Sequence, residues 1–385
     1  MAVNRSQPHS EPRRLRTPEF HRDPFPTYRY LRDEHPVFHD SERGAFVLTR
    51  YADVRDAARD HVRFSSAATR SEVFDRITRM DPPEHDVWRA LLATRFRPRR
   101  VATIEPDVRR TARNLVEFAR NAGELEVVEH FAAPIPSTTI GDLIGLERHL
   151  HMRCHALSEI SIAGAPEQAA VANDEIYAMF EPLLAARRSE PRDDLISALL
   201  TAEVDGRPLT HEELLGYLLH LVVAGNDTTA NLIGTGIVYL AGDLELRARL
   251  VADPSLIPAF VEEMLRFDGP VHMLYRATAV PVEMHGVVIP AGAVVELYWG
   301  AANRDERNFV DPDSFVLGRT DAGHVGFGHG VHFCLGSHLA RLEARVAFEE
   351  LLAMAPSYRL DPDQPLEIKP GWSIRGYRRA VIELR

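Results

Sequence analysis

Residues 327–336 read Phe327-Gly328-His329-Gly330-Val331-His332-Phe333-Cys334-Leu335-Gly336, and they set one cysteine in a glycine-rich turn. The segment that follows, Ser337 to Leu352, has the pattern of a helix. Glycines let the chain approach the sulfur closely, and the N–H groups at the start of a helix favour the thiolate form of cysteine. The turn therefore predicts one thiolate that is presented to a metal, with Phe327 excluding water from one side of the sulfur.

A single thiolate restricts the kind of metal centre that this chain can hold. Structural zinc and iron–sulfur sites need several cysteine or histidine ligands, and no second ligand lies at the right spacing from Cys334. The metal must therefore bring most of its own ligands, which is what haem does. The other cysteine, Cys154, lies in a helical segment without glycines and is interpreted as an apolar core residue.

The phenylalanine, the three glycines, the histidine and the cysteine stand at offsets that resemble the haem-binding loop of the cytochrome P450 family. The resemblance extends over nearly the whole chain after residue 20. It implies a mostly α fold with small β sheets, in which one large domain carries a long central helix over the haem. It also implies that Cys334 binds the iron of haem b and that Phe327, Gly328, His332 and Gly336 contact the cofactor.

The composition excludes several classes of protein. A hydrophobic content of 45% in 385 residues supports a large buried core, while a net charge of −11 disfavours nucleic acid as a partner. Two cysteines cannot form a disulfide scaffold, and a free thiolate fits a reducing cytoplasm. The apolar stretches are too short to span a membrane. We expect a soluble, cytoplasmic monomer with a flexible tail over residues 1–20 and a haem domain over residues 21–385.

Capping signals predict where the main helices begin. Asp81-Pro82-Pro83-Glu84 has the pattern of a capped helix start, for a helix to about Arg95, and Thr210-His211-Glu212-Glu213 opens a long apolar helix to about Ala241. A third helix is expected over about Pro258 to Phe267. Strands are expected at three places: Val37 to Leu48, Val280 to Leu297, and Ala380 to Leu384.

The long helix contains an unusual polar segment, Ala224-Gly225-Asn226-Asp227-Thr228-Thr229. Glycine destabilises a helix by ~1 kcal/mol relative to alanine, and a threonine hydroxyl can bond the carbonyl one turn earlier. One interpretation is proton delivery by an acid and a hydroxyl beside a redox metal, and the other is a helix kink satisfied by its own side chains. The segment resembles the oxygen-activation motif of the same family. That resemblance implies catalytic roles for Asp227 and Thr228 and room for oxygen at Ala224 and Gly225.

Two helical pairs of charged residues have further interpretations. Glu263 and Arg266, three apart on one helix face, resemble the Glu-x-x-Arg signature of the family, and Arg319 resembles its third member, which implies a brace behind the haem loop. His85 and Arg89, four apart, share a face of another helix. Taken alone, each pair is interpreted as ordinary helix surface. Given a haem, the resemblance implies that its two propionates are bound by four residues: His85, Arg89, Arg276 and His332.

Six arginines form a basic cluster in this acidic chain: Arg95, Arg97, Arg99, Arg100, Arg109 and Arg110. Such a cluster is either ordinary solvated surface or, as the resemblance implies, a docking face for a small acidic ferredoxin. Because the sequence ends soon after Arg375, we expect no fused reductase. We therefore expect separate ferredoxin and ferredoxin reductase partners that pass on electrons from NAD(P)H.

These features predict a haem-thiolate monooxygenase that inserts one oxygen atom from O2 into a small organic substrate, in secondary metabolism or catabolism. Two alternatives stay open. A peroxide-dependent haem-thiolate enzyme would not need the Asp227-Thr228 pair, and a catalytically silent recruitment or sensor protein would tolerate loss of that pair or of the cysteine loop.

The substrate itself is not identified by the sequence. The expected pocket walls are Ser65 to Arg79, His220, Val223, Ala224, Val271 to Leu274, Ser373 and Ile374. Two imidazoles, those of His220 and His272, are expected in this pocket. Because buried polar groups need hydrogen-bond partners, they predict either a substrate with an oxygen-bearing group or ordered water.

Overall fold

The structure is a computed structural model that describes residues 15, 17–67, 77–321, 323–371 and 373–384. Most of the expected tail, and residues 68–76 of the expected pocket wall, lie outside the described residues. Helix α1 (Pro18–Arg22) lies across the expected boundary at residue 20, and its Phe20 is buried. The folded part of the chain therefore begins before residue 21.

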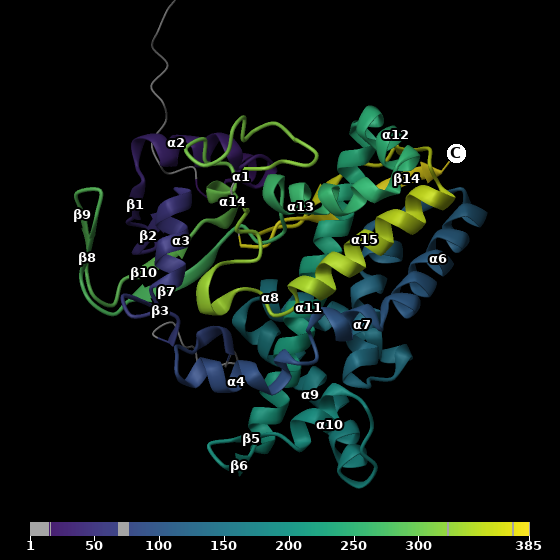
Figure 1. Cartoon of the computed structure of the whole chain (residues 1–385), viewed down its shortest axis with the longest axis horizontal. Helices are drawn as coiled ribbons and strands as arrows, with labels where there is room; N and C mark the ends of the chain where they lie inside the picture. The colour runs from purple at the N-terminus through teal and green to yellow at the C-terminus, as the bar shows by residue number, and fades with distance from the viewer. Residues whose placement is uncertain (1–14, 16, 68–76, 322, 372, 385) are drawn as a thin grey trace, which may run out of the picture.

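Helices make up most of the described chain, as predicted, and they surround one long helix, α11 (Figure 1). The other α-helices after α1 are α2 (Phe25–Glu34), α3 (Tyr51–Arg59), α4 (Glu84–Ala93), α5 (Pro98–Ala102), α6 (Glu105–Ala122), α7 (Pro134–Ile144), α8 (His151–Ala163), α9 (Pro166–Ser189), α10 (Leu195–Leu200), α12 (Leu244–Ala252), α13 (Ile257–Phe267), α14 (Trp299–Ala302) and α15 (Ser337–Met354). Short 3₁₀ or π turns are η3 (Ile77–Arg79), η4 (Val128–Ala132), η5 (Arg148–Leu150), η6 (Pro254–Leu256) and η7 (Gly330–His332).

The strands form small sheets, and all three predicted strand regions are confirmed. The largest sheet has the order β1-β2-β10-β7-β3, in which β10 pairs with β2 in parallel and with β7 antiparallel. Its strands are β1 (Val37–Asp40), β2 (Ala45–Leu48), β3 (Phe64–Ser65), β7 (Leu274–Thr278) and β10 (Val294–Leu297). The smaller pairings use β4 (Glu124–Glu126), β5 (Glu203–Val204), β6 (Arg207–Pro208), β8 (Val282–Met284), β9 (Val287–Ile289), β11 (Tyr358–Leu360), β12 (Glu367–Ile368), β13 (Tyr377–Arg379) and β14 (Val381–Leu384).

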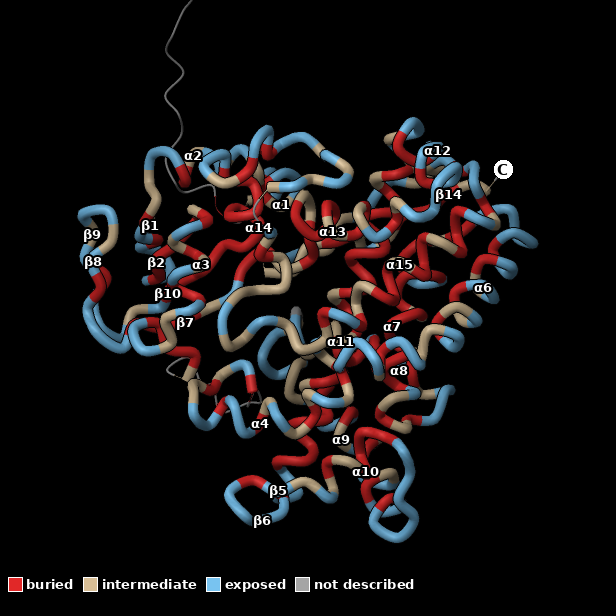
Figure 2. The backbone as a smooth tube through the Cα atoms, viewed as in Figure 1, coloured by how far each residue is buried: buried red, intermediate tan, exposed pale blue. Residues whose placement is uncertain are grey.

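Helix α11 (His211–Gly242) begins at the predicted capping box. The Thr210 hydroxyl accepts the N–H of Glu213 at 3.2 Å, and the Glu213 carboxylate accepts the N–H of Thr210 at 2.8 Å. At ~1.5 Å per residue its 32 residues form a helix about 48 Å long. Most of its residues are buried, as are most of those of α15, which packs against it (Figure 2). Within the described part of the chain, none of the helices combines the length and the apolar character needed to cross a bilayer.

The predicted helix cap at Asp81 is wrong. Helix α4 begins at Glu84, after Pro83, and no side chain caps it. The Asp81 carboxylate instead accepts hydrogen bonds from the Ser65 hydroxyl at 2.5 Å and from the Ser66 N–H at 2.9 Å. These donors occupy the oxygens that a cap would need, so Asp81 fastens the end of β3 to the start of α4.

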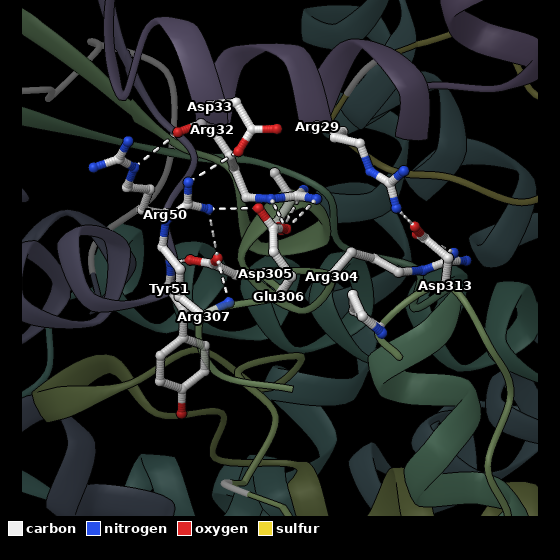
Figure 3. A network of polar contacts seen from close by, with 12 residues as sticks. Arg29, Arg32, Asp33, Arg50, Tyr51, Arg304, Asp305, Glu306, Arg307 and Asp313 are labelled. Carbon is white, nitrogen blue, oxygen red and sulfur yellow. Dashed lines mark hydrogen bonds and ion pairs between the residues drawn. The ribbon is translucent and has the colours of Figure 1, made fainter. Parts of the chain in front are cut away.

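A polar network fastens the N-terminal helices to the segment that follows α14 (Figure 3). Arg32 on α2 is fully buried, donates to the Ala301 carbonyl at 3.0 Å and pairs with Glu306 at 3.2 Å. The N–H of Tyr51 donates to Asp305 at 2.8 Å. Because buried charges must be paired, this network fixes the register between the first and last thirds of the chain.

Candidate functional site

The loop before α15 holds Cys334 in the geometry that its glycines predict. The N–H of Cys334 donates to the Phe327 carbonyl at 2.9 Å, and the N–H of Gly328 donates to the Val325 carbonyl at 2.9 Å. Gly328 and Gly330 both have a φ of +73°, a conformation that favours glycine. A Cβ on Gly330 would also lie 2.7 Å from the Ala58 carbonyl oxygen of α3. Any other residue at these two positions would strain the loop, and at Gly330 it would also clash with α3.

Cys334 is half-buried as a residue. Without a bound metal, burial raises the pKa of Cys334, while the N–H of Gly336 and the charges of Arg89 and Arg341 favour the thiolate. The thiol of Cys154 has no such surroundings: burial raises its pKa to about 12. This contrast supports the interpretation of Cys154 as a core residue.

Helix α13 braces this loop through two acids. Glu263 pairs with Arg266 at 2.7 Å and with Arg319 at 3.2 Å, which places the three residues of the predicted brace together. The neighbouring acid, Glu262, forms a second cluster that the sequence did not reveal. It accepts from Arg341 at 2.6 Å and from His324 at 3.1 Å. Burial opposes its ionisation, but these two donors hold the pKa of Glu262 at about 2.

Helix α11 exposes one stripe in the middle of its buried length. His220, Val223, Ala224 and Thr228 retain accessible surface, and their spacing places them on one face of the helix. The Thr228 hydroxyl donates to the Ala224 carbonyl at 3.0 Å, which confirms the predicted bond to the preceding turn. Gly225 packs against Ile140, since a Cβ there would lie 3.3 Å from that side chain. Between Leu221 and Val238, the residues of this helix that keep accessible surface are Val223, Ala224 and Thr228 of the stripe, together with Gly225.

A cluster of nitrogen donors lies where the cysteine loop meets α4 and β7. The rings of His85 and His332 are 4.3 Å apart, and the Nε2 atom of each is buried without a hydrogen-bond partner among the described residues. Burial, followed by the charge of Arg276, lowers the pKa of His332 to about 3, and burial also lowers the pKa of His85. Arg89 donates to the Phe333 carbonyl at 2.6 Å.

Arg276 completes this cluster from strand β7. Its side chain is buried and donates a hydrogen bond to the Tyr275 carbonyl at 2.7 Å, and burial lowers its pKa to about 10. Buried ring nitrogens without partners and a buried cation that makes no ion pair with the described residues are costly, and two carboxylates would satisfy them when the Nε2 atoms carry protons. The residues thus fit the haem propionates, with Cys334 nearby to bind the iron. The four residues that the sequence grouped for this purpose lie together.

Asp227 lies about 100° round the helix axis from Thr228 and is buried. Its carboxylate accepts a hydrogen bond from Lys369, which also donates to Glu159 on α8. The sequence analysis missed both partners. One signal was available, because Lys369 is the only lysine in the sequence.

The expectation that His272 faces the substrate pocket is wrong. This residue is 3% exposed, and its Nδ1 lies 2.9 Å from the Tyr28 hydroxyl. Its Nε2 lies 3.6 Å from Asp268, which pairs with Arg375 at 2.8 Å. Tyr28 is far away in sequence, so no local pattern could have shown that His272 already has partners within the protein. His220, on the accessible stripe of α11, stays a candidate pocket residue.

The arginine cluster is mostly paired with acids of this chain. Arg109 binds Glu105 at 2.7 Å, Glu349 at 2.6 Å and Glu350 at 2.7 Å, which clamps α6 onto α15. The other pairs are Arg95 and Arg100 with Asp193, and Arg110 with Asp107. Among the described residues, Arg97 and Arg99 are exposed and have no ion pair. A docking face for a ferredoxin would therefore contain fewer unpaired arginines of this cluster than the sequence suggested.

Comparison with known proteins gives a consistent set of relatives. The protein-family model described as Cytochrome P450 matches residues 165–370. The chain is 36% identical over 384–390 aligned positions to several curated proteins; one is cytochrome P450 monooxygenase PikC of Streptomyces venezuelae, with 95% of this chain and 92% of that protein covered. It is 37% identical to the vitamin D(3) 25-hydroxylase of Pseudonocardia autotrophica, with 89% and 88% covered.

Solved structures agree with this set. The structure of CYP109E1 from Bacillus megaterium in complex with testosterone matches with a TM-score of 0.90 at 31% identity, and the match covers 96% of this chain and 100% of that one.

Proposed function

The chain belongs to the cytochrome P450 family, and from this premise we propose that it inserts one oxygen atom of dioxygen into a small organic substrate, in secondary metabolism or catabolism. The family implies a haem cofactor, and the chain is a monooxygenase. Three features together carry the proposal. They are the Cys334 loop, the buried ring nitrogens of His85 and His332 that have no hydrogen-bond partner within the described chain, and the accessible stripe of α11.

Each feature has its own role in this proposal. Cys334 holds the iron, with Phe327, Gly328 and Gly336 shaping the loop around the sulfur. His85, Arg89, Arg276 and His332 hold the two propionates. When bound, the haem supplies the redox chemistry that activates dioxygen. Ala224 and Gly225, which have no bulky side chains, leave room for oxygen beside it.

Proton delivery is assigned to Asp227 and Thr228. The Thr228 hydroxyl lies on the accessible stripe and donates to the Ala224 carbonyl, so its oxygen is free to accept a further hydrogen bond. Asp227 is the nearest acid along the helix, and its carboxylate accepts a hydrogen bond from Lys369. A proton that reaches the stripe through these side chains does not require bulk water in the pocket.

Electrons are proposed to come from a ferredoxin and its reductase, which oxidises NAD(P)H. The two unpaired arginines are Arg97, which directly precedes α5, and Arg99, which lies within it, so both follow the propionate-binding helix α4 in the chain. Exposed cations at this place suit an acidic partner.

The test uses the haem-loaded protein with NADH, a surrogate ferredoxin and its reductase, and a panel of organic compounds. Compounds are first selected by the shift of the haem absorption band, and turnover is then run under isotope-labelled dioxygen. We expect one labelled oxygen atom in the product. Product formed only with added peroxide would favour the peroxide-dependent alternative, and no oxygen consumption with any ligand that shifts the band would favour a silent protein.

A further inference from the structure

The sequence contains 45 Lys and Arg residues in total, and all of them except Lys369 are arginines. Lys369 therefore carries the one side-chain ammonium group of the chain. The two side chains differ chemically: the guanidinium is a planar fork that binds carboxylates with two bonds, and the ammonium is a compact point charge. The position of Lys369 therefore merits comparison with its partners.

The ammonium lies between two carboxylates from different helices. It donates to Glu159 on α8 and to Asp227 on α11. The side chains become less exposed along this row, from 37% for Glu159 to 15% for Lys369 and 6% for Asp227. Burial alone would favour the neutral amine, but the two carboxylates raise the pKa of Lys369. The group is thus a charged bridge between a half-exposed acid and a buried one.

The backbone around Lys369 is fixed. Its N–H donates to the Gly376 carbonyl at 3.0 Å, which closes the base of the hairpin formed by β12 and β13. A Cβ on Gly376 would lie 2.2 Å from the Asn231 side chain of α11, so the hairpin sits directly on the helix one turn beyond Asp227. The backbone of Lys369 is consequently anchored next to α11, while its ammonium reaches the two acids through a flexible stem.

We propose that Lys369 is a positioning residue for Asp227, which it holds beside the accessible stripe through one releasable hydrogen bond while Glu159 shares its charge. The proposal rests on the role given to Asp227 in the proposed function. When the Asp227 carboxylate turns toward Thr228, the ammonium stays paired with Glu159, so no buried charge is left alone. An arginine would hold Asp227 with two bonds and oppose that movement.

Two variants separate shape from charge. Lys369→Arg keeps the charge, and Lys369→Gln removes it. We expect both to bind haem and ligand as the parent does, and both to divert reducing equivalents into hydrogen peroxide, with product per NADH lowered by about tenfold or more. Arg359→Gln, which breaks an exposed pair with Glu383 at 2.7 Å, is the matched control and should keep the parent ratio. Parent-like coupling in either Lys369 variant would overturn the proposal.

A second readout does not depend on turnover. Because the chain has one lysine, protein grown with isotope-labelled lysine gives one side-chain ammonium signal in NMR, which can be recorded on the diamagnetic reduced carbon monoxide complex. We expect a signal protected from solvent exchange in the parent, and one that moves and exchanges faster in Asp227→Asn and in Glu159→Gln. An unchanged signal in Asp227→Asn would show that the two groups do not meet. If the parent oxidises no ligand, the proposed function fails, while the NMR result still decides the contact.

Discussion

Thr228 is the side chain with the sharpest predicted effect at the residue scale. Replacing it with alanine removes the hydroxyl from the accessible stripe but leaves the stripe open. We expect unchanged ligand binding and a loss of coupling, with most NADH consumption appearing as hydrogen peroxide, because proton-transfer groups of this kind contribute about 10²–10⁴-fold. Thr228→Ser retains the hydroxyl and should recover most of the coupling. The ratio of product to peroxide is the measurement, and equal ratios for alanine and the parent would exclude the relay.

Glu343 gives a prediction of pH dependence. It lies on α15 and is 1% exposed. Burial raises the pKa of its carboxyl group from an ordinary 4.5 to about 8, and the hydrogen bonds with Thr139 and Thr229 oppose this rise only in part. The folded state thus binds a proton that the unfolded state has released. The contribution of Glu343 to the free energy of unfolding is fully present below about pH 4.5. It is lost as the pH rises toward about 8, by at most ~1.4 kcal/mol per pH unit.

The test of this linkage is denaturant unfolding between pH 5 and pH 9. Glu343→Gln preserves the shape but cannot ionise, so its stability should fall less over this range than that of the parent. Parallel curves for the two proteins would contradict the assignment of a neutral Glu343.

Individual residues also show which parts of the site could be predicted from the sequence and which could not. Cys334 and its glycines are adjacent in the chain, and Gly225 to Thr228 lie within one turn, so each group carries its own pattern. Lys369, Glu159 and Tyr28 act through contacts with residues far away in sequence, and no local pattern reports such contacts. For Asp81 the local pattern gave a wrong prediction. It matched a helix cap, but the Asp81 carboxylate accepts hydrogen bonds from Ser65 and Ser66 instead.

At the scale of elements, the arginine cluster divides into two parts. The clamp between α6 and α15 uses Arg109 and Arg113 with Glu350, and it supports the helix that follows the cysteine loop. Only Arg97 and Arg99 remain for a partner. A basic run in a sequence does not show how many of its charges are already paired within the chain.

The docking prediction follows from this division. Reversing both Arg97 and Arg99 to glutamate should slow reduction by ferredoxin at low salt, and the difference should shrink as salt rises, since charges are screened beyond ~10 Å at 0.1 M. Arg188→Glu, at an exposed position on α9, makes a charge reversal away from this segment and should have a smaller effect. Stopped-flow reduction rates over a salt series measure both. Salt-independent, equal rates for the double variant and the parent would leave these arginines as ordinary surface.

At the scale of the whole molecule, the chain brings together residues from its first, middle and last thirds. The propionate cluster draws His85 from α4, Arg276 from β7 and His332 from the cysteine loop, while α11 crosses beside them. Helices α4, α11, α13 and α15, and the length of α11, could be predicted from capping and apolar patterns. The small sheets could not be assembled in the same way, because the parallel pairing of β2 with β10 joins residues about 250 positions apart.

The central claim is that Cys334, and not Cys154, holds a haem in this fold. It is tested most directly by the absorption spectrum of the reduced carbon monoxide complex, recorded for the parent, Cys334→Ser and Cys154→Ser. The account predicts the long-wavelength band of a thiolate-bound haem in the parent and in Cys154→Ser, and its loss in Cys334→Ser. A band that survives in Cys334→Ser, or that disappears in Cys154→Ser, would contradict the account.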